Sequence, residues 1–117
     1  YEGDAARDWL FVRDTCEAVE LLIEKGRPGQ IYHIGTYEHR TVKQVAEVIL
    51  KTMGKPELLV GFKGRRLQDD ERYSLDWGKI RNELAWAPQT SFESGIRATI
   101  DWFGRNEWFW RHFVDTP

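Results

Sequence analysis

Three sets of residues in this sequence could act together on a phosphate group. Arg7 opens the stretch RDWLFVRD, Thr41 begins a segment with helical periodicity, and Arg65 and Arg66 stand side by side in KGRRLQDDE. Guanidinium groups bind phosphate through two parallel hydrogen bonds, and a helix N-terminus offers unpaired N–H groups and the positive end of a dipole. Together these residues predict a diphosphate site. A surface ion pair between Arg7 and Asp8 is the alternative interpretation of the first stretch.

Metal and dinucleotide sites have no matching pattern in the sequence. The histidines, His33, His39 and His112, are scattered, and Cys16 is the single cysteine, so no metal-ligand spacing occurs. No G-x-x-G-x-x-G turn follows a predicted strand, so nothing would hold a dinucleotide pyrophosphate. We therefore expect no metal site and no cofactor site within this chain.

Other notable residues have structural interpretations. His33 lies in a predicted buried strand, where a histidine is usually hydrogen-bonded within the core. Cys16 lies early in a predicted helix and should pack as an inert side chain. The acidic run at residues 69–71 is typical of a solvated loop, and Trp108 and Trp110 are typical of packing or interface residues.

Composition limits the class of protein. The chain has 117 residues, of which 41% are hydrophobic and 14% aromatic, so it can bury a core. Its formal net charge is −2, with no basic block, which argues against nucleic acid or a membrane surface as the main partner. A single cysteine cannot close a disulfide within the chain, and no apolar run approaches the roughly 20 residues of a membrane span. We expect a soluble, cytoplasmic protein.

Hydrophobic periodicity predicts strands and helices in alternation. Strands are expected at residues 9–12, 30–35 and 57–62, and residues 30–35 (QIYHIG) should be buried on both faces. Thr41 with Gln44, and Thr90 with Glu93, match the capping box that begins a helix. The expected helices are residues 14 to about 25 with Asp14 as cap, residues 41–53, residues 76–84 with Asp76 as cap, and one from residue 90 onward.

This order of elements favours an α/β fold with parallel neighbouring strands. Loops that leave the carboxyl ends of parallel strands meet at one edge, where ligands bind. The loops after residues 30–35 and 57–62 should therefore lie close together. Three or four short strands form a poor sheet for so many apolar residues, so we expect residues 1–117 to be one region of a larger body.

Longer motifs identify a family. RDWLFVRD is similar to R-D-W-L-Y-V-E-D, and PGQIYHIG to P-G-x-x-Y-N-I-G. ERYSLDWGKIRNELAWAPQTSFESGIRATIDWF is similar to R-R-Y-A-I-D-x-x-K-I-x-x-E-L-G-W-x-P-x-x-x-F-E-x-G-(I/L)-x-x-T-(I/V)-x-W-Y. These motifs belong to the nucleotide-sugar 4,6-dehydratases, which are extended short-chain dehydrogenases/reductases with a Rossmann-type fold. Nearly the whole chain resembles their C-terminal third, the substrate-binding portion.

The resemblance implies which residues face the diphosphate of a nucleotide sugar. Arg7 stands where the family has the arginine of R-D-W-L, and Thr41 where it has an asparagine that opens the helix. The family loop D-R-P-G-H-D falls on residues 65–70, where Arg66 keeps the family arginine. The remaining positions of this loop that the resemblance assigns to the substrate depart from the family pattern. They are Arg65, Leu67, Gln68 and Asp69.

The resemblance also implies what lies outside the chain. NAD would be bound by the parent enzyme upstream of these residues, together with the catalytic Y-x-x-x-K pair. The implied reaction passes a hydride from the sugar C4 to NAD, eliminates water across C5–C6 and returns the hydride to C6. We expect the parent to be a homodimer. The departures in the loop, and His33 in place of asparagine, leave a UDP-sugar dehydratase, epimerase or decarboxylase open, and a standalone interaction module is the alternative from another class.

Overall fold

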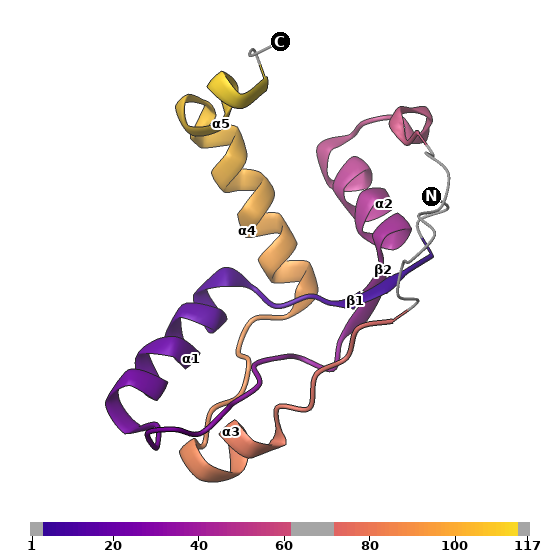
Figure 1. Ribbon diagram of the computed structural model, residues 1–117. Helices are drawn as coiled ribbons and strands as arrows, with labels where there is room; N and C mark the ends of the chain where they lie inside the picture. The colour runs from indigo at the N-terminus through magenta and orange to yellow at the C-terminus, as the bar shows by residue number, and fades with distance from the viewer. Residues whose placement is uncertain (1–3, 62–71, 115–117) are drawn as a thin grey trace.

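Two short strands lie among five α-helices in the computed structural model, which describes residues 4–61 and 72–114 (Figure 1). The β1–β2 pair occupies the middle of the view, with α1 and α3 on one side and α2 and the α4–α5 arm on the other. The elements are β1 (Ala6–Asp8), α1 (Val12–Lys25), β2 (His39–Thr41), α2 (Val42–Met53), a 3₁₀ turn η1 (Glu57–Leu59), α3 (Gly78–Leu84), α4 (Phe92–Arg105) and α5 (Glu107–Val114).

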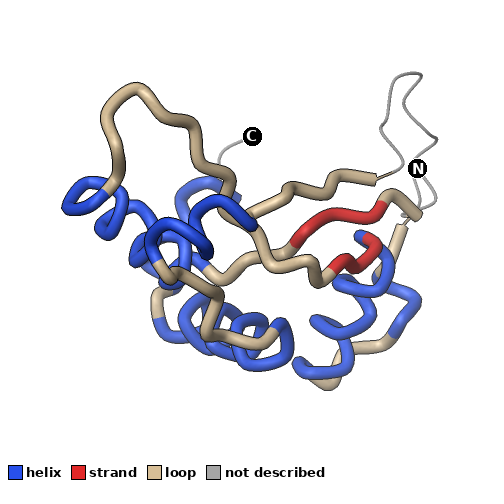
Figure 2. Tube along the Cα trace, turned by 90° about the horizontal axis from the view of Figure 1, so that it is seen from below, coloured by secondary structure: helices blue, strands red, loops and turns tan. Residues whose placement is uncertain are grey.

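The strands pair antiparallel, whereas the sequence predicted parallel neighbours. Ala6 lies opposite Thr41, Arg7 opposite Arg40 and Asp8 opposite His39, as the two red segments of Figure 2 show side by side. The strand predicted at residues 9–12 is wrong, because β1 ends at Asp8 and α1 begins at residue 12. The apolar residues 9–11 connect the two elements instead of entering the sheet.

The segment 30–35 is not a strand in the described structure. Its Ile31 side chain is 77% exposed and His33 is exposed, so neither lies in a core. Lys79 on α3 donates to the Ile31 carbonyl at 3.1 Å, which occupies a backbone acceptor that a sheet would use. No strand of the described residues pairs with this segment, so its high β propensity does not lead to a strand.

The third predicted strand is also wrong where the structure describes it. Residues 57–59 form η1, in which the Val60 N–H donates to the Glu57 carbonyl at 2.9 Å. Leu58 and Leu59 are exposed, and Phe62 lies outside the described residues. As with the segment 30–35, no strand among residues 4–61 and 72–114 pairs with these residues to hold them extended.

Helix ends follow the local signals more closely than helix starts. The predicted Asp14 cap of α1 is wrong, because Phe11 is the N-cap and Asp14 lies inside the first turn. Gly26 ends α1, and Gly54 ends α2 with a left-handed φ of 62°. α3 ends at Leu84 as expected, but its N-cap is Trp77 and not the predicted Asp76. The Asp76 carboxylate still accepts from the Gly78 N–H at 2.8 Å. The predicted Thr90–Glu93 capping box is wrong, because Ser91 caps α4 by accepting from the Ser94 N–H.

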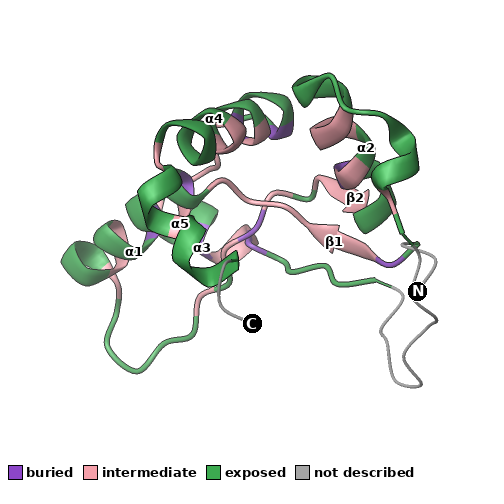
Figure 3. Ribbon diagram, turned by 90° about the horizontal axis from the view of Figure 1, so that it is seen from above, coloured by how far each residue is buried: buried purple, intermediate pink, exposed green. Residues whose placement is uncertain are grey.

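The core is small and lies between α1 and α3 (Figure 3). Ala18, Trp77, Ile80 and Trp86 are buried together, and the Trp77 and Trp86 rings meet edge to face at 5.8 Å. On α1, Leu22 packs against this core, whereas Val19 and Ile23 are exposed. No helix in the described parts of the chain is long and apolar enough to cross a membrane.

Candidate functional site

Arg7 is the central residue of β1 and lies opposite Arg40 of β2. Its side chain is half-buried, and its Nη1 donates to the Ala6 carbonyl at 2.9 Å. The guanidinium carbon lies 5.0 Å from the centroid of the Tyr73 ring, which is a cation–π distance. The aromatic face and the carbonyl therefore fix where this guanidinium points.

Asp8 bonds to the loop that precedes β2. Its carboxylate accepts from the Thr36 N–H, at 3.1 and 3.0 Å to its two oxygens, and from the Thr36 hydroxyl. The loop passes so close that a Cβ on Gly35 would lie 2.5 Å from Asp8 Oδ2. The carboxylate next to Arg7 thus holds the 35–38 loop against β1, a role that the sequence did not indicate.

The loop is held at a second point, by Tyr37. This residue has a left-handed φ of 61°, and its hydroxyl donates to the Asp76 carboxylate. The Tyr37 hydroxyl, with the Gly78 N–H as a second donor, lowers the pKa of Asp76, and the same bond raises the pKa of Tyr37. The 35–38 loop is therefore anchored to both β1 and the residues before α3.

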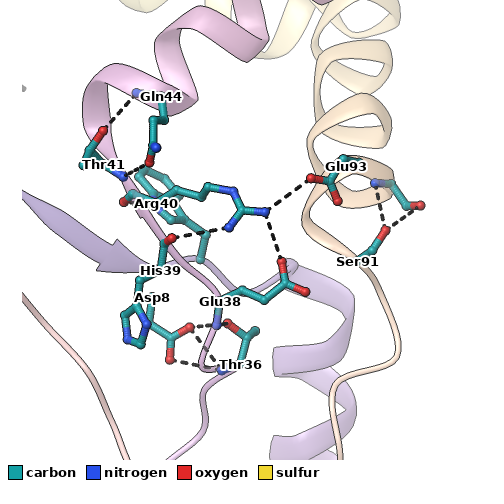
Figure 4. Close-up of polar contacts among 11 residues, drawn as sticks. Asp8, Thr36, Glu38, His39, Arg40, Thr41, Gln44, Ser91 and Glu93 are labelled. Atoms are coloured by element: carbon teal, nitrogen blue, oxygen red, sulfur yellow. Dashed lines mark hydrogen bonds and ion pairs between the residues drawn. The ribbon is translucent and has the colours of Figure 1, made fainter.

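Arg40 is compensated by carboxylates of the chain itself. Its Nη2 lies 3.4 Å from Glu93 on α4 and 3.7 Å from Glu38, and its guanidinium carbon is 5.2 Å from the Phe92 ring (Figure 4). Figure 4 shows the guanidinium between these two carboxylates. Arg40 therefore joins β2 to α4.

Thr41 caps α2, as the sequence predicted. Its hydroxyl accepts from the Gln44 N–H at 3.1 Å, and Gln44 Oε1 accepts from the Thr41 N–H at 2.8 Å. The Val42 N–H donates to the Ala5 carbonyl at 3.3 Å. The prediction that this helix start offers unpaired N–H groups is therefore wrong for Val42 and Gln44.

Arg72 joins the site although the sequence did not single it out. It forms a parallel bridge with Ala6, and the following Tyr73 N–H donates to the Ala6 carbonyl at 3.1 Å. The Arg72 guanidinium lies 3.2 Å from His39 Nδ1. Because arginine only donates, His39 Nδ1 must accept, which places the imidazole proton on Nε2. In the sequence, the ERY motif is the signal that could have pointed to Arg72.

Five predicted substrate contacts lie outside the described residues. Arg72 is the first described residue after them, and it forms a bridge with Ala6 of β1. The prediction that this stretch lies close to the loop after residues 30–35 also concerns residues outside the described part of the chain. The five residues are Arg65, Arg66, Leu67, Gln68 and Asp69.

The remaining candidates form no second site. Cys16 is exposed, so the expectation that it packs is wrong. The His112 and Phe113 rings stack at 3.9 Å on α5, far along the chain from β1. Across residues 4–61 and 72–114, no three His, Cys, Asp or Glu side chains are arranged to hold a metal ion.

Known proteins resemble nearly all of this chain. The family model described as GDP-mannose 4,6 dehydratase matches residues 2–99. A dTDP-glucose 4,6-dehydratase of Actinoplanes sp. is 38% identical over 93% of the chain and 34% of its own length. A trifunctional UDP-glucose 4,6-dehydratase/UDP-4-keto-6-deoxy-D-glucose 3,5-epimerase/UDP-4-keto-L-rhamnose-reductase of Arabidopsis thaliana is 37% identical over 93% of the chain and 16% of its own length.

Solved structures agree with the sequence comparisons. The dTDP-glucose 4,6-dehydratase of Streptomyces venezuelae, solved with NAD and TYD bound, is 35% identical and superposes with a TM-score of 0.88. The match covers 94% of this chain and 34% of that one. The expected α/β class is thereby confirmed, and the chain corresponds to the C-terminal part of such enzymes. It spans about a third of the length of the first curated relatives it matches.

Proposed function

The chain belongs to the GDP-mannose 4,6 dehydratase family, and on that premise we propose that it is the substrate-binding portion of a nucleotide-sugar 4,6-dehydratase. The dTDP-glucose 4,6-dehydratases among its relatives make dTDP-glucose the first substrate to test. In this proposal Arg7 and Arg66 bind the diphosphate, with Thr41 and the rest of the 65–69 stretch around it. The chain binds and orients the substrate, and the catalytic groups lie elsewhere in the parent.

One structural observation carries the proposal. Ala6 pairs with Thr41 on one side and with Arg72 on the other, so β1 lies between the start of α2 and Arg72. Thr41, which the family motifs assign to the diphosphate, and Arg72 therefore both lie beside β1, one residue from Arg7. Thr41 and Arg72 follow Arg7 by 34 and 65 positions in the sequence, so no local interaction brings them beside it. Their meeting at β1 therefore supports a shared function.

No glycine fingerprint for NAD follows a strand in the described residues. Among the described glycines, the Gly26–Gly29 pair follows a helix rather than a strand, and a Cβ on Gly26 would lie 2.4 Å from the Leu22 carbonyl oxygen. Gly26 therefore serves the end of α1. We assign cofactor binding to the part of the parent outside this chain and derive no catalytic step from these residues.

The nucleotide can be tested by titration calorimetry on the complete parent polypeptide with dTDP and with UDP. We expect both to bind and dTDP to bind more tightly. The Arabidopsis relative makes UDP the specific competitor, and tighter UDP binding would transfer the assignment to a UDP-sugar enzyme.

The role of Arg7 is tested in the same titration. Arg7→Ala should weaken nucleotide binding by about 1.5–3 kcal/mol, the range for hydrogen bonds to charged groups. Arg97→Ala removes the same charge from an exposed position on α4 and should leave affinity unchanged. Equal affinities of the Arg7 variant and the wild type would contradict the site. The homodimeric parent is proposed on the resemblance alone, and sedimentation of the complete polypeptide tests it.

A further inference from the structure

Two arginines lie directly opposite each other in the β1–β2 pair. Arg7 pairs with Arg40, and opposite residues of an antiparallel pair send their side chains to the same face, with Cβ atoms about 4.5–5.5 Å apart. Like charges in this arrangement repel each other and destabilise the pair. The surrounding structure must therefore offset or separate the two guanidinium charges.

Arg40 is offset by two carboxylates and directed toward α4. Its Nη2 lies 3.4 Å from Glu93 Oε1 and 3.7 Å from Glu38 Oε2, and its Nη1 donates to the His39 carbonyl at 3.4 Å. The guanidinium carbon also lies at a cation–π distance, 5.2 Å, from the centroid of the Phe92 ring. Figure 4 shows the side chain extended from β2 toward α4. These contacts hold the Arg40 charge in a carboxylate-lined position.

The two carboxylates come from distant parts of the chain. Glu93 lies in the first turn of α4, directly after Phe92, where the positive end of the helix dipole favours a negative charge. Glu38 belongs to the loop before β2, and its N–H donates to the Thr36 hydroxyl at 2.9 Å. A helix start and an anchored loop therefore bring their carboxylates to the same arginine.

We propose that Glu38 and Glu93 are positioning residues that withhold Arg40 from the ligand of Arg7 and thereby weaken diphosphate binding. The proposal rests on the diphosphate site proposed above for Arg7. An arginine side chain is longer than the separation between opposite Cβ atoms, so Arg40 released from its carboxylates reaches an anion beside Arg7 from the same face. A second guanidinium adds charge-assisted hydrogen bonds to that anion. Residues that do not touch the ligand therefore set how tightly it is bound.

Titration calorimetry with dTDP on the complete parent polypeptide tests the proposal. Glu93→Gln removes one carboxylate and keeps the shape of the side chain. We expect this variant to bind dTDP at least about three-fold more tightly, since even weakly interacting charges a few ångströms apart near a surface change affinity by this much. Adding Glu93→Gln to an Arg40→Ala background should give no gain, because the guanidinium that it releases is absent.

Asp101→Asn is the matched control. It removes a carboxylate of α4 that pairs with Arg105 at 3.2 Å rather than with Arg40, and it should leave dTDP affinity unchanged. Glu38→Gln provides a second test without altering α4, and it should tighten binding in the same direction. The gain should shrink as NaCl rises from about 0.05 to 0.5 M, because salt screens the released charge.

The outcomes separate this proposal from the proposed function. Unchanged or weaker dTDP binding in both Glu93→Gln and Glu38→Gln would overturn it. So would a gain that persists in the Arg40→Ala background or does not respond to salt. Loss of affinity in Arg7→Ala without a gain in the carboxylate variants would reject this proposal and leave the diphosphate site standing. Wild-type affinity in Arg7→Ala would reject the site, and this proposal with it.

Discussion

The buried Asp14 carboxylate of α1 accepts hydrogen bonds from both the N–H and the hydroxyl of Thr90, each at 2.9 Å. The Gln89 N–H donates to the same carboxylate at 3.2 Å. Asp14 is only 2% exposed, and its three donors belong to the segment that leads into α4. A single carboxylate therefore ties α1 to the segment that leads into α4.

Removing this carboxylate should destabilise the chain more than any surface change. Asp14→Ala leaves two N–H groups and a hydroxyl without their partner, so we expect a loss of about 3 kcal/mol in the free energy of unfolding, at the upper end for bonds to a charged group. Urea unfolding followed by circular dichroism measures it. Glu17→Ala, an exposed position on the same helix, is the control and should change stability by less than about 0.5 kcal/mol.

Gly35 and Asp8 should show coupled effects on stability. Gly35→Ala places a Cβ against Asp8 Oδ2, and we expect it to cost about 1–3 kcal/mol. In an Asp8→Ala background the obstructing oxygen is gone, so the same change should cost much less. Gly61→Ala, at a glycine whose Cβ would meet nothing within 4 Å, is the control. Additive costs in the double variant would mean that the close approach of the loop to Asp8 does not restrict residue 35.

Arg66 should contribute to nucleotide binding in the complete polypeptide. Its family position predicts a phosphate contact, so Arg66→Ala should weaken dTDP binding by about 1.5–3 kcal/mol in calorimetry. A double variant with Arg7→Ala would reveal whether the two guanidinium groups bind the same ligand, since shared contacts give non-additive losses. Wild-type affinity in both single variants would reject the diphosphate site.

The bond between Tyr37 and Asp76 should stabilise the chain only within a limited pH range. The pKa of Asp76 is lowered from its ordinary 3.8, so its contribution is present above that pH and is lost as pH falls through the folded value. The pKa of Tyr37 is raised from 10.0, so its contribution is present below that pH and is lost as pH rises through the folded value.

Tyr37→Phe tests this range. The variant should be less stable than the wild type at pH 7, and the difference should shrink at pH 2 and above pH 11. In NMR titration the Asp76 carboxyl should titrate at a higher pH in the variant than in the wild type. An unchanged Asp76 midpoint would show that the Tyr37 hydroxyl does not determine its pKa.

The sequence by itself determined the features that arise within one turn of helix. Thr41 and Gln44 are three residues apart and form their capping box with no help from the rest of the chain. Gly26 and Gly54 end α1 and α2 for equally local reasons. The family motifs are likewise linear patterns, so the resemblance could be found without coordinates.

Tertiary structure decided the strands, the buried polar groups and the site geometry. Arg7 meets Arg40, and Asp14 meets Thr90, across long stretches of sequence, and no local pattern encodes which partner each will find. Thr90 was expected to cap α4, but its hydroxyl bonds to Asp14 and leaves the cap to Ser91. The segment 30–35 has strong β propensity yet forms no strand, because a strand requires a paired neighbour and the described chain supplies none. Propensity acts on each residue singly, whereas pairing depends on two segments meeting in space.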